Sequence, residues 1–445
     1  MAANLEQLFT GHLAVMRERA DAALAASSFD HLLVYSGGLH YGFLDDNAYA
    51  FKVNPHFKRW VPVTGNPQCL LVYTPGEKPK LAFYSPVDFW HTVHPVPEDF
   101  WTAHFDIQPV ASIDDAASLL PRNRDRAALI GEPAPLFREW GVKNLNPANL
   151  LDDLHYHFAW KTEYEVECMR EANRLGARGH LAAEGAFRAG ASEYEIHLAY
   201  LEATNHIDAD LPYGNIVALN EHAAVLHHGH QSRRKPDEIR SFLIDAGCTF
   251  NGYASDITRT YSAKPDEFQQ LIDRMEHSQR ALCDAVKPGM EYVDLQMLAH
   301  RHVADILVEF GIATGDADAL IANGVTRAFY PHGVGHYLGA QVHDVGGKIA
   351  DAKGTPIPQP EDQPFLRLLR RIEIGQVFTV EPGLYFIDSL LDGLRGTDAE
   401  KTVNWKRVDE FRPYGGIRIE DNVRVTEGGH ENLTRPAFAE LEGEV

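Results

Sequence analysis

The chain has 445 residues, of which 44% are hydrophobic and 23% charged, a composition that suits two or three globular domains with proper cores. Its net charge of −22 comes from 41 basic and 63 acidic residues without a long block of either sign, which argues against a nucleic-acid partner. No apolar run approaches the roughly 20 residues that span a bilayer. The first 24 residues predict an amphipathic helix and lack the pattern of a signal peptide. We therefore expect a cytoplasmic protein that binds neither nucleic acid nor membrane.

The four cysteines do not predict a disulfide framework or a zinc knuckle. They are widely spaced and form no CxxC pair; they are Cys69, Cys168, Cys248 and Cys283. Buried free thiols are the better interpretation.

The N-terminal part alternates strand-like and helical segments, which predicts an α/β domain over residues 1–158. Strands are expected near 31–37, 68–74, 80–85 and 127–132. The proline-rich stretch 94–101 is expected to be a surface loop. No constellation of metal ligands occurs in this part.

Residues 159–445 have a different pattern, which predicts a second, α+β domain with hairpins. A long helical segment covers 162–190, and Ser192 with Glu195 three residues later forms the signature of a helix N-terminal capping box. Further strands are expected near 215–220, 241–262, 376–387 and 416–426, and helices near 266–285 and 292–311. The candidate ligands fall early and late in this part, which suggests two half-domains that face each other.

Five candidate metal ligands occur in strand-like contexts of this second domain. They are Asp245 in FLIDAG, Asp256 in ASDITRTY, His336 in HGVGHYLG, Glu381 in FTVEPG and Glu420 in GIRIED. One imidazole and four carboxylates suit a pair of hard divalent cations, and a bridging carboxylate can hold two ions about 3.5–4 Å apart. The set implies metal-assisted hydrolysis.

The two aspartates are predicted to lie on one hairpin. Asn251-Gly252 favours a two-residue type I′ turn, and pairing outward from it puts Gly247 opposite Asp256. Asp245 is then a diagonal neighbour of Asp256, within roughly 7–8 Å at the backbone. Gly247, without a side chain, is expected to leave the space between them open. The alternative is that Asp245 caps a turn and Asp256 is an edge charge.

The two glutamates follow a similar logic. Arg418 and Glu420 alternate with isoleucines and share one face of a strand, although two such polar groups could simply face solvent. Glu381 ends the apolar run VFTV and is followed at once by Pro-Gly. A carboxylate at the end of a buried strand is costly without a partner, which favours a functional role.

Two histidine-rich stretches accompany these carboxylates. Residues 331–347 hold His332, His336 and His343 in glycine-rich loops, and glycines at 333 and 335 argue against a helical zinc site. The second stretch, EHAAVLHHGH, is a weaker signal, and we expect one functional histidine among its four.

These motifs together resemble the pita-bread metallopeptidases, the family that includes methionine aminopeptidase, aminopeptidase P and prolidase. The segments LDDNAYAFKVNPHFKRWVPVTGNPQCLL, NIVALNEHAAVLH and RSFLIDAG resemble the bacterial prolidases, the Xaa-Pro dipeptidases. The resemblance covers nearly the whole chain. It implies a creatinase-like α/β N-terminal domain followed by an α+β pita-bread catalytic domain.

The resemblance also implies roles for individual residues. Asp256 and Glu420 match carboxylates that bridge two ions, Asp245 matches a ligand of one ion, and His336 and Glu381 match ligands of the other. His332 and His343 match histidines that contact the substrate and the tetrahedral intermediate, and Glu381 matches a proton shuttle. Substrate-binding positions are implied for His227, Arg418, Arg370, Tyr213 and Val342. Arg367 competes with Arg370 for the substrate carboxylate, and His228 stands where tyrosine is common.

The implied reaction is hydrolysis of Xaa-Pro dipeptides by an enzyme with two divalent ions per subunit, with manganese favoured by the oxygen-rich ligands. Aminopeptidase P, which takes longer peptides, is the nearest alternative. The long stretch between Glu381 and Glu420 resembles a dipeptidase insertion.

Phosphotriester hydrolysis is expected at most as a side reaction. A non-catalytic pita-bread binding module or metal-free creatinase chemistry is improbable because all five ligands are present. The family also implies a homodimer.

Overall fold

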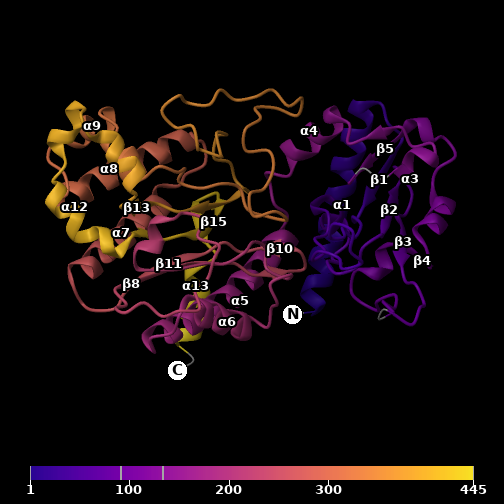
Figure 1. Ribbon diagram of the computed structural model, residues 1–445. Helices are drawn as coiled ribbons and strands as arrows, with labels where there is room; N and C mark the ends of the chain where they lie inside the picture. The colour runs from indigo at the N-terminus through magenta and orange to yellow at the C-terminus, as the bar shows by residue number, and fades with distance from the viewer. Residues whose placement is uncertain (1, 91–92, 133–134, 444–445) are drawn as a thin grey trace. The chain divides into compact units, whose positions relative to one another are not determined.

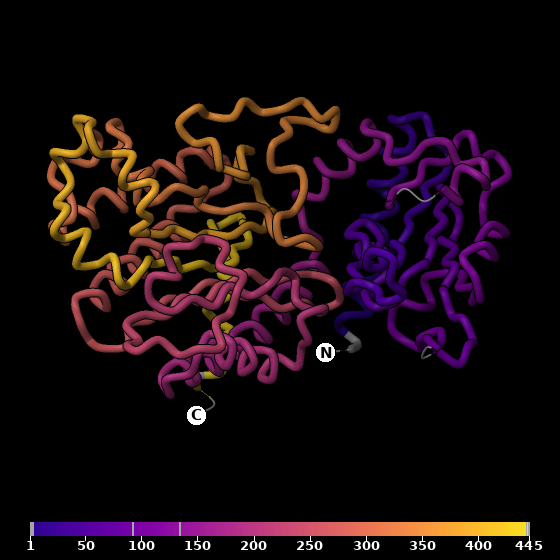
Figure 2. The backbone as a smooth tube through the Cα atoms, viewed as in Figure 1, coloured from indigo at the N-terminus to yellow at the C-terminus, as the bar shows by residue number. Residues whose placement is uncertain are grey.

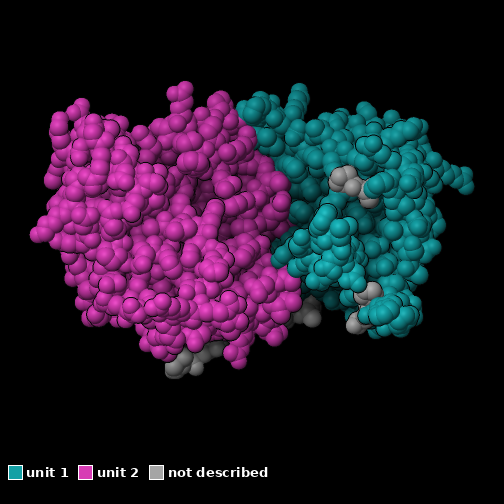
Figure 3. All heavy atoms as spheres, viewed as in Figure 1, with its two compact units in different colours: residues 1–168, 250–253, 349–356 teal, residues 169–249, 254–348, 357–445 magenta. Residues whose placement is uncertain are grey.

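The computed structural model describes residues 2–90, 93–132 and 135–443 (Figure 1). The chain divides into two compact units, coloured separately in Figure 3. The N-terminal unit consists of residues 1–168, 250–253 and 349–356, and the C-terminal unit of residues 169–249, 254–348 and 357–445. The first unit thus extends beyond the predicted boundary at residue 158 and includes two short later segments. Figure 2 traces the backbone of both units.

The N-terminal unit is built on a mixed sheet, six-stranded within the described residues, in the order β4-β3-β2-β1-β5-β6. β1 pairs antiparallel with β2 and parallel with β5, while β3 and β4 are parallel. The predicted strands correspond to β1, β2, β3 and β5. β4 was not predicted because DIQPV is polar and contains proline, and β6 has only two residues. The strands are β1 His31–Tyr35, β2 Leu70–Tyr73, β3 Lys80–Tyr84, β4 Asp106–Val110, β5 Ala127–Ile130 and β6 Asn144–Leu145.

One face of this sheet forms a buried core. Alternate strand residues such as Leu33, Leu70 and Leu129 pack with Leu119 and Phe137 from the segments that follow β4 and β5. The helix α1 contacts β1 and packs on α4. Its buried residues recur every three or four positions, which confirms the amphipathic pattern; they are Leu5, Phe9, Leu13, Met16 and Ala20. Met1, also included in that pattern, lies outside the described residues.

The helices of this unit are α1 Ala2–Ser27, α2 Pro55–Trp60, α3 Pro135–Glu139 and α4 Ala148–His157, with 3₁₀ turns η1 Thr102–His104, η2 Ile113–Leu119 and η3 Arg124–Arg126. The next helix, α5, covers Glu163–Arg188 and matches the predicted segment 162–190. It is followed by α6 Glu193–Thr204, which begins with the predicted capping box of Ser192 and Glu195.

The C-terminal unit contains short antiparallel sheets, ordered β11-β8-β7, β12-β15-β16 and β13-β14 in the described residues. A bridge between Thr258 and Glu420 joins the early strands to the late ones. The helix α7 contacts β11, β12, β14 and β16, so one helix covers strands of both groups. The strands are β7 Ile216–Leu219, β8 Ser241–Asp245, β11 Thr258–Ser262, β12 Val377–Val380, β13 Gly383–Tyr385, β14 Gly416–Arg418, β15 Asp421–Thr426 and β16 Gly429–Asn432. The short strands β9 Thr249–Phe250 and β10 Tyr253–Ala254 each have one residue in either unit.

The remaining helices are α7 Glu267–Ala285, α8 Tyr292–Glu309, α9 Ala317–Ala322, α10 Val325–Phe329, α11 Asp388–Leu391, α12 Trp405–Phe411 and α13 Arg435–Glu442, with 3₁₀ turns η4 Asn220–Ala224, η5 Asp392–Leu394, η6 Asp398–Thr402 and η7 Arg412–Tyr414. Among the described helices, none has both the length and the apolar character needed to cross a membrane. The four cysteines are buried and free, as predicted.

Candidate metal centre and active site

Asp245 and Asp256 come from the two arms of the predicted hairpin. Asp245 ends β8 and lies opposite Thr258, the first residue of β11. Asn251 and Gly252 have φ angles of 49° and 84°, and two positive φ angles are what a type I′ turn requires. The turn and the register are therefore those predicted from the sequence, and the two aspartates are diagonal neighbours.

Gly247 does not leave the open space that was predicted between the aspartates. A Cβ atom at this position would lie 2.0 Å from the carbonyl oxygen of Ser255 and 3.0 Å from a carbon of Pro212. Glycine is needed here because the opposite backbone approaches so closely. The prediction about Gly247 was wrong, since backbone atoms fill the space that a side chain would take.

Tyr213 brings the two aspartate side chains together. Its hydroxyl lies 2.7 Å from Oδ1 of Asp245 and 2.5 Å from Oδ1 of Asp256. One hydroxyl has a single hydrogen to donate, so it cannot satisfy both carboxylates at once. Two buried carboxylates that share one donor need additional positive charge nearby.

His336 and Glu381 are held together by the pairing of a glycine-rich loop with β12. The Thr379 N–H donates to the His336 carbonyl oxygen, and the Glu381 N–H donates to the Val334 carbonyl oxygen, at 3.0 and 2.8 Å. A Cβ atom at Gly335 would lie 2.0 Å from the Thr379 carbonyl oxygen, so this pairing requires glycine. As a result, Nε2 of His336 lies 3.7 Å from a carboxylate oxygen of Glu381.

Glu420 reaches the same place through the bridge between the early and late strands. Its N–H donates to the carbonyl oxygen of Thr258 at 3.0 Å, and the Thr258 hydroxyl donates to its Oε2 at 2.7 Å. Nε2 of His336 is 3.3 Å from Oδ2 of Asp256. The ligand atoms of Asp256, His336 and Glu420 all lie within 4.8 Å of one another, and the three residues are buried.

The electrostatics of this cluster fit a divalent cation. Oε1 of Glu420 is buried without a hydrogen-bond partner. Burial and the negative charges of Asp256 and Glu381 raise the pKa of Glu420 well above its usual range. Burial also raises the pKa of Glu381 to about 7, although His336 opposes the shift. A buried carboxylate oxygen without a donor, among several other carboxylates, is costly unless a cation binds there.

Arg418 and Tyr385 form a connected pair beside this cluster. Arg418 donates from Nη2 to Oδ2 of Asp245 at 2.7 Å and from Nη1 to the hydroxyl of Tyr385 at 3.0 Å. That hydroxyl lies 2.8 Å from Nε2 of His332. No pattern in the sequence singled out Tyr385 or Thr258, because their roles depend on contacts with distant strands.

Both ring nitrogens of His332 have protein partners. Nδ1 lies 2.8 Å from the carbonyl oxygen of Gly333, which can only accept, so Nδ1 carries the proton and Nε2 accepts from Tyr385. Burial and the charge of Arg418 lower the pKa of His332 to about 3, so the ring is neutral at neutral pH.

His343 stacks edge-on against His336, with ring centroids 4.3 Å apart. Partial burial and the neighbouring His336 lower its pKa to about 4. The ring remains accessible to solvent. His343 is therefore a neutral imidazole that a bound molecule can reach.

A cavity of about 850 Å³ opens over these residues. It is lined by all five predicted ligands and by most of the other predicted site residues, namely His332, His343, His227, Arg418, Tyr213 and Val342. Arg367 also lines it, whereas Arg370 is not among its lining residues and forms an ion pair with Glu373 at 3.5 Å. The cavity thus favours Arg367 over Arg370 as the arginine that a substrate would meet.

The histidines of EHAAVLHHGH separate in the structure. His227 lines the cavity, His230 is exposed, and His222 and His228 lie against Glu193. No sequence pattern connects Glu193 with these histidines, because they lie about 30 residues apart in the chain and meet only through tertiary contacts.

The chain matches two family models. Residues 7–156 match "Xaa-Pro dipeptidase, N-terminal domain", and residues 167–427 match "Metallopeptidase family M24". The chain is 48% identical to the Xaa-Pro dipeptidase of Shewanella sediminis, with 96% of this chain and 97% of that protein covered. It is 49% identical to the Xaa-Pro dipeptidase of Stenotrophomonas maltophilia, with 98% of each covered.

Solved structures of aminopeptidases have a similar fold. The aminopeptidase PepP of Pseudomonas aeruginosa superposes with a TM-score of 0.72 at 26% identity and covers 97% of each chain. The fold predicted from the sequence, an N-terminal α/β domain followed by a pita-bread domain, is confirmed. The chain belongs to metallopeptidase family M24 and is a hydrolase of that family, whose members use divalent metal ions.

Proposed function

We propose that this protein is an Xaa-Pro dipeptidase that uses two divalent ions, with manganese as the ion in the cell. The similarity over nearly the full length to proteins named Xaa-Pro dipeptidase supports the substrate class. The observation that carries the chemistry is the buried cluster of Asp256, His336 and Glu420, whose Glu420 carries a buried oxygen without a partner beside the cavity.

Asp256 and Glu420 would bridge the two ions, Asp245 would bind one of them, and His336 and Glu381 the other. The closeness of Asp245 and Asp256 around Tyr213 supports this assignment. Four carboxylates and one imidazole favour manganese over zinc. When bound, the ions supply Lewis-acid activation of the scissile carbonyl and of a water molecule.

The side chains around the cluster would orient the substrate and move its protons. Glu381 would take the proton from the attacking water, and Nδ1 of His332 and Nε2 of His336, 3.6 and 3.7 Å from its two oxygens, hold its carboxylate beside the cluster. His343, accessible and neutral, would donate a hydrogen bond to the charge that develops on the carbonyl oxygen. His332 would act with it once its ring releases the Gly333 carbonyl.

Selectivity for dipeptides would come from hydrogen-bond donors and positive charges that line the same cavity. His227, Lys348 and Arg367 all face it, and a free C-terminal carboxylate near the metals would meet them. A longer peptide has no carboxylate at that position, which is the argument against aminopeptidase P activity. Phosphotriester hydrolysis stays a prediction for a side reaction.

Proline release from Ala-Pro and from Ala-Pro-Ala tests the proposal. Chelator-treated protein should be inactive, and added Mn(II) should restore cleavage of Ala-Pro alone. Cleavage of the tripeptide as well would move the assignment to aminopeptidase P. Absence of cleavage of either peptide with Mn(II) would refute the proposal.

Arg367→Gln and Arg370→Gln form a matched pair for the carboxylate contact. We expect Arg367→Gln to raise KM for Ala-Pro about 10- to 100-fold, the effect of losing a charged hydrogen bond worth about 1.5–3 kcal/mol. Arg370→Gln should leave KM unchanged. The reverse result would assign the contact to Arg370.

We also propose a cytoplasmic homodimer. Large apolar side chains of the N-terminal unit are exposed, which supports a contact between copies; they include Tyr41, Phe43, Leu44, Phe89 and Trp90. Sedimentation of the wild type and of a Phe43→Ser variant tests the dimer. We expect the variant to be monomeric, and a monomeric wild type would refute the dimer.

A further inference from the structure

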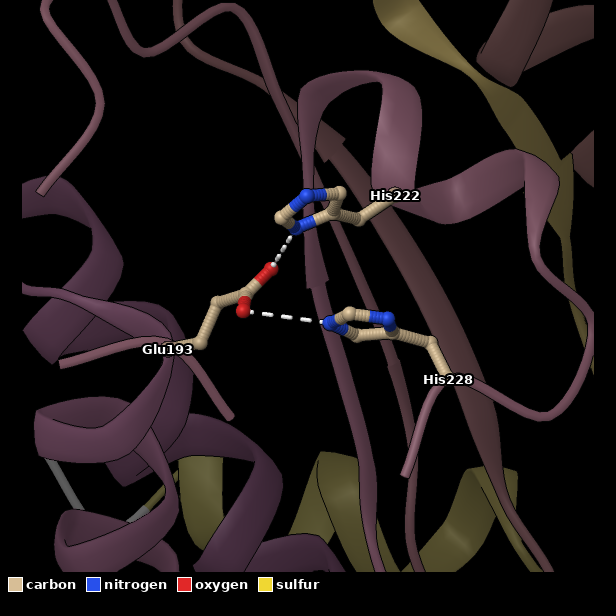
Figure 4. A group of neighbouring side chains, drawn as sticks. All are labelled: Glu193, His222 and His228. Carbon is tan, nitrogen blue, oxygen red and sulfur yellow. Dashed lines mark hydrogen bonds and ion pairs between the residues drawn. The ribbon is translucent and has the colours of Figure 1, made fainter. Parts of the chain in front are cut away.

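A second group of potential metal ligands lies in the C-terminal unit (Figure 4). Glu193 is the first residue of α6, His222 lies in η4, and His228 lies in the loop that follows. Nδ1 of His222 is 2.7 Å from Oε1 of Glu193, and Nε2 of His228 is 3.1 Å from its Oε2. The two imidazole rings stack with centroids 4.5 Å apart and an interplanar angle of 27°.

The carboxylate of this group is fixed in place and shielded from water. The Glu193 side chain is 2% exposed, against 12% for His228 and 44% for His222. Backbone N–H groups of Leu219 and Ser232 donate to the two carboxylate oxygens, both at 2.9 Å. Glu193 and His222 line a cavity of about 250 Å³, which gives an ion access to the carboxylate and to the more exposed imidazole.

We propose that Glu193, His222 and His228 form a third metal site, for a single borderline transition-metal ion such as Zn²⁺. Two imidazoles and one carboxylate, completed by water, are a recurring zinc ligand set. Their ligand atoms all lie within 4.8 Å of one another. Tetrahedral zinc with bonds of about 2.0–2.1 Å spaces its ligands about 3.3 Å apart, and the spacings of 2.7 and 3.1 Å between each imidazole nitrogen and its carboxylate oxygen are close to that value.

The ligand chemistry separates this site from the carboxylate-rich cluster. Imidazole suits zinc, copper or nickel, whereas carboxylate and water suit manganese. Without a metal, each ring donates an N–H to Glu193. When an ion binds between the three groups, each ring carries its proton on the other nitrogen, so the two nitrogens that face Glu193 present lone pairs to the metal.

The nearby basic residues do not block a cation. Arg234 and Lys235 also line the 250 Å³ cavity, but they are 87% and 53% exposed. Arg234 pairs with Asp237 at 3.9 Å and Lys235 with Glu195 at 3.3 Å. Their charges are therefore paired elsewhere and screened by solvent.

Measurement of the zinc content per chain of the full-length protein tests the site. In an Asp256→Asn/Glu420→Gln background, which removes the bridging carboxylates of the other cluster, dialysis against micromolar free Zn²⁺ should leave one zinc per chain. His228→Tyr in that background should lose it. His230→Gln, a change of the exposed neighbouring histidine, should retain it. An equal zinc content in all three proteins would overturn the proposal.

Cobalt substitution gives a second test, in case the double variant does not fold. Co²⁺ added to the manganese-loaded full chain should give the intense visible absorption of a tetrahedral site, and His228→Tyr should abolish it. Absence of that absorption in the wild type would overturn the proposal. Neither readout uses peptide cleavage, so failure of the proposed peptidase function would leave both tests intact.

Discussion

The C-terminal unit holds two clusters of carboxylates and histidines that differ in how their charge is balanced. At Glu420 a buried carboxylate oxygen has no donor, and burial with neighbouring Asp256 raises the pKa of Glu420. At Glu193 two backbone N–H groups and two histidines supply a donor for each lone-pair direction. Burial alone would raise the pKa of Glu193, but these hydrogen bonds lower it to about 2.

The contrast indicates which of the two clusters depends on a bound cation. The Asp256–His336–Glu420 cluster concentrates negative charge that the protein does not neutralise, so the folded state favours a bound metal. The Glu193 cluster is satisfied without one, so an ion there competes with existing hydrogen bonds. We expect chelators to remove metal from the Glu193 cluster first.

Neutralising Glu420 should have the largest effect on activity. We expect Glu420→Gln to lower kcat/KM for Ala-Pro at least about 10³-fold, about 4 kcal/mol in the barrier. The thermal midpoint of the metal-free variant should equal or exceed that of the metal-free wild type, because a buried charge is removed. Steady-state kinetics and calorimetry measure the two effects. The exposed Glu427→Gln serves as a control, and retained activity in Glu420→Gln would remove Glu420 from the ligand set.

Arg418→Lys should lower kcat/KM about 10- to 100-fold, the range found when groups that orient metal ligands are changed. The planar guanidinium of Arg418 donates to Asp245 and to Tyr385 at the same time, and the single ammonium group of lysine cannot reproduce that geometry. Manganese titration should show weaker binding. Arg280→Lys, on an exposed helix face beside Glu276, is the matched control. Unchanged manganese affinity in Arg418→Lys would refute this role.

Glu193→Gln should lower the thermal stability and leave kcat/KM for Ala-Pro unchanged, which is the opposite of the effect expected for Glu420→Gln. The folded pKa of about 2 lies below the ordinary value of 4.5, so the stabilisation is present above pH 4.5 and is lost as the pH falls towards 2. The shift corresponds to about 3 kcal/mol. Thermal midpoints of the two proteins in chelator should differ at pH 7 and converge only as the pH approaches 2. A pH-independent difference would contradict the charge argument.

Tyr385→Phe should have the smallest effect, a decrease of about tenfold or less in kcat, because the two hydrogen bonds that are lost, each worth about 1 kcal/mol, orient side chains outside the predicted ligand set. Its hydroxyl connects Arg418 to His332 and touches no predicted metal ligand. KM for Ala-Pro should stay constant. A change in KM larger than the change in kcat would place Tyr385 in substrate binding.

Features that depend on residues close together in the chain could be predicted from the sequence. Asn251-Gly252 fixed the turn and the register of the hairpin because only such residues accept two positive φ angles at low cost. Ser192 and Glu195 fixed the start of α6 through hydrogen bonds to adjacent backbone. The buried strands and long helices followed from the spacing of apolar residues, and the ligand motifs indicated the family.

The tertiary structure alone decided which side chains meet across the fold. It brought Arg367 to the cavity where Arg370 had been predicted, filled the space at Gly247 with backbone, and joined Glu193 to two histidines far along the chain. It also connected His332 to Tyr385 and Arg418. These contacts join segments that are close only after the sheets pair and the helices pack, so no local pattern of residues encodes them.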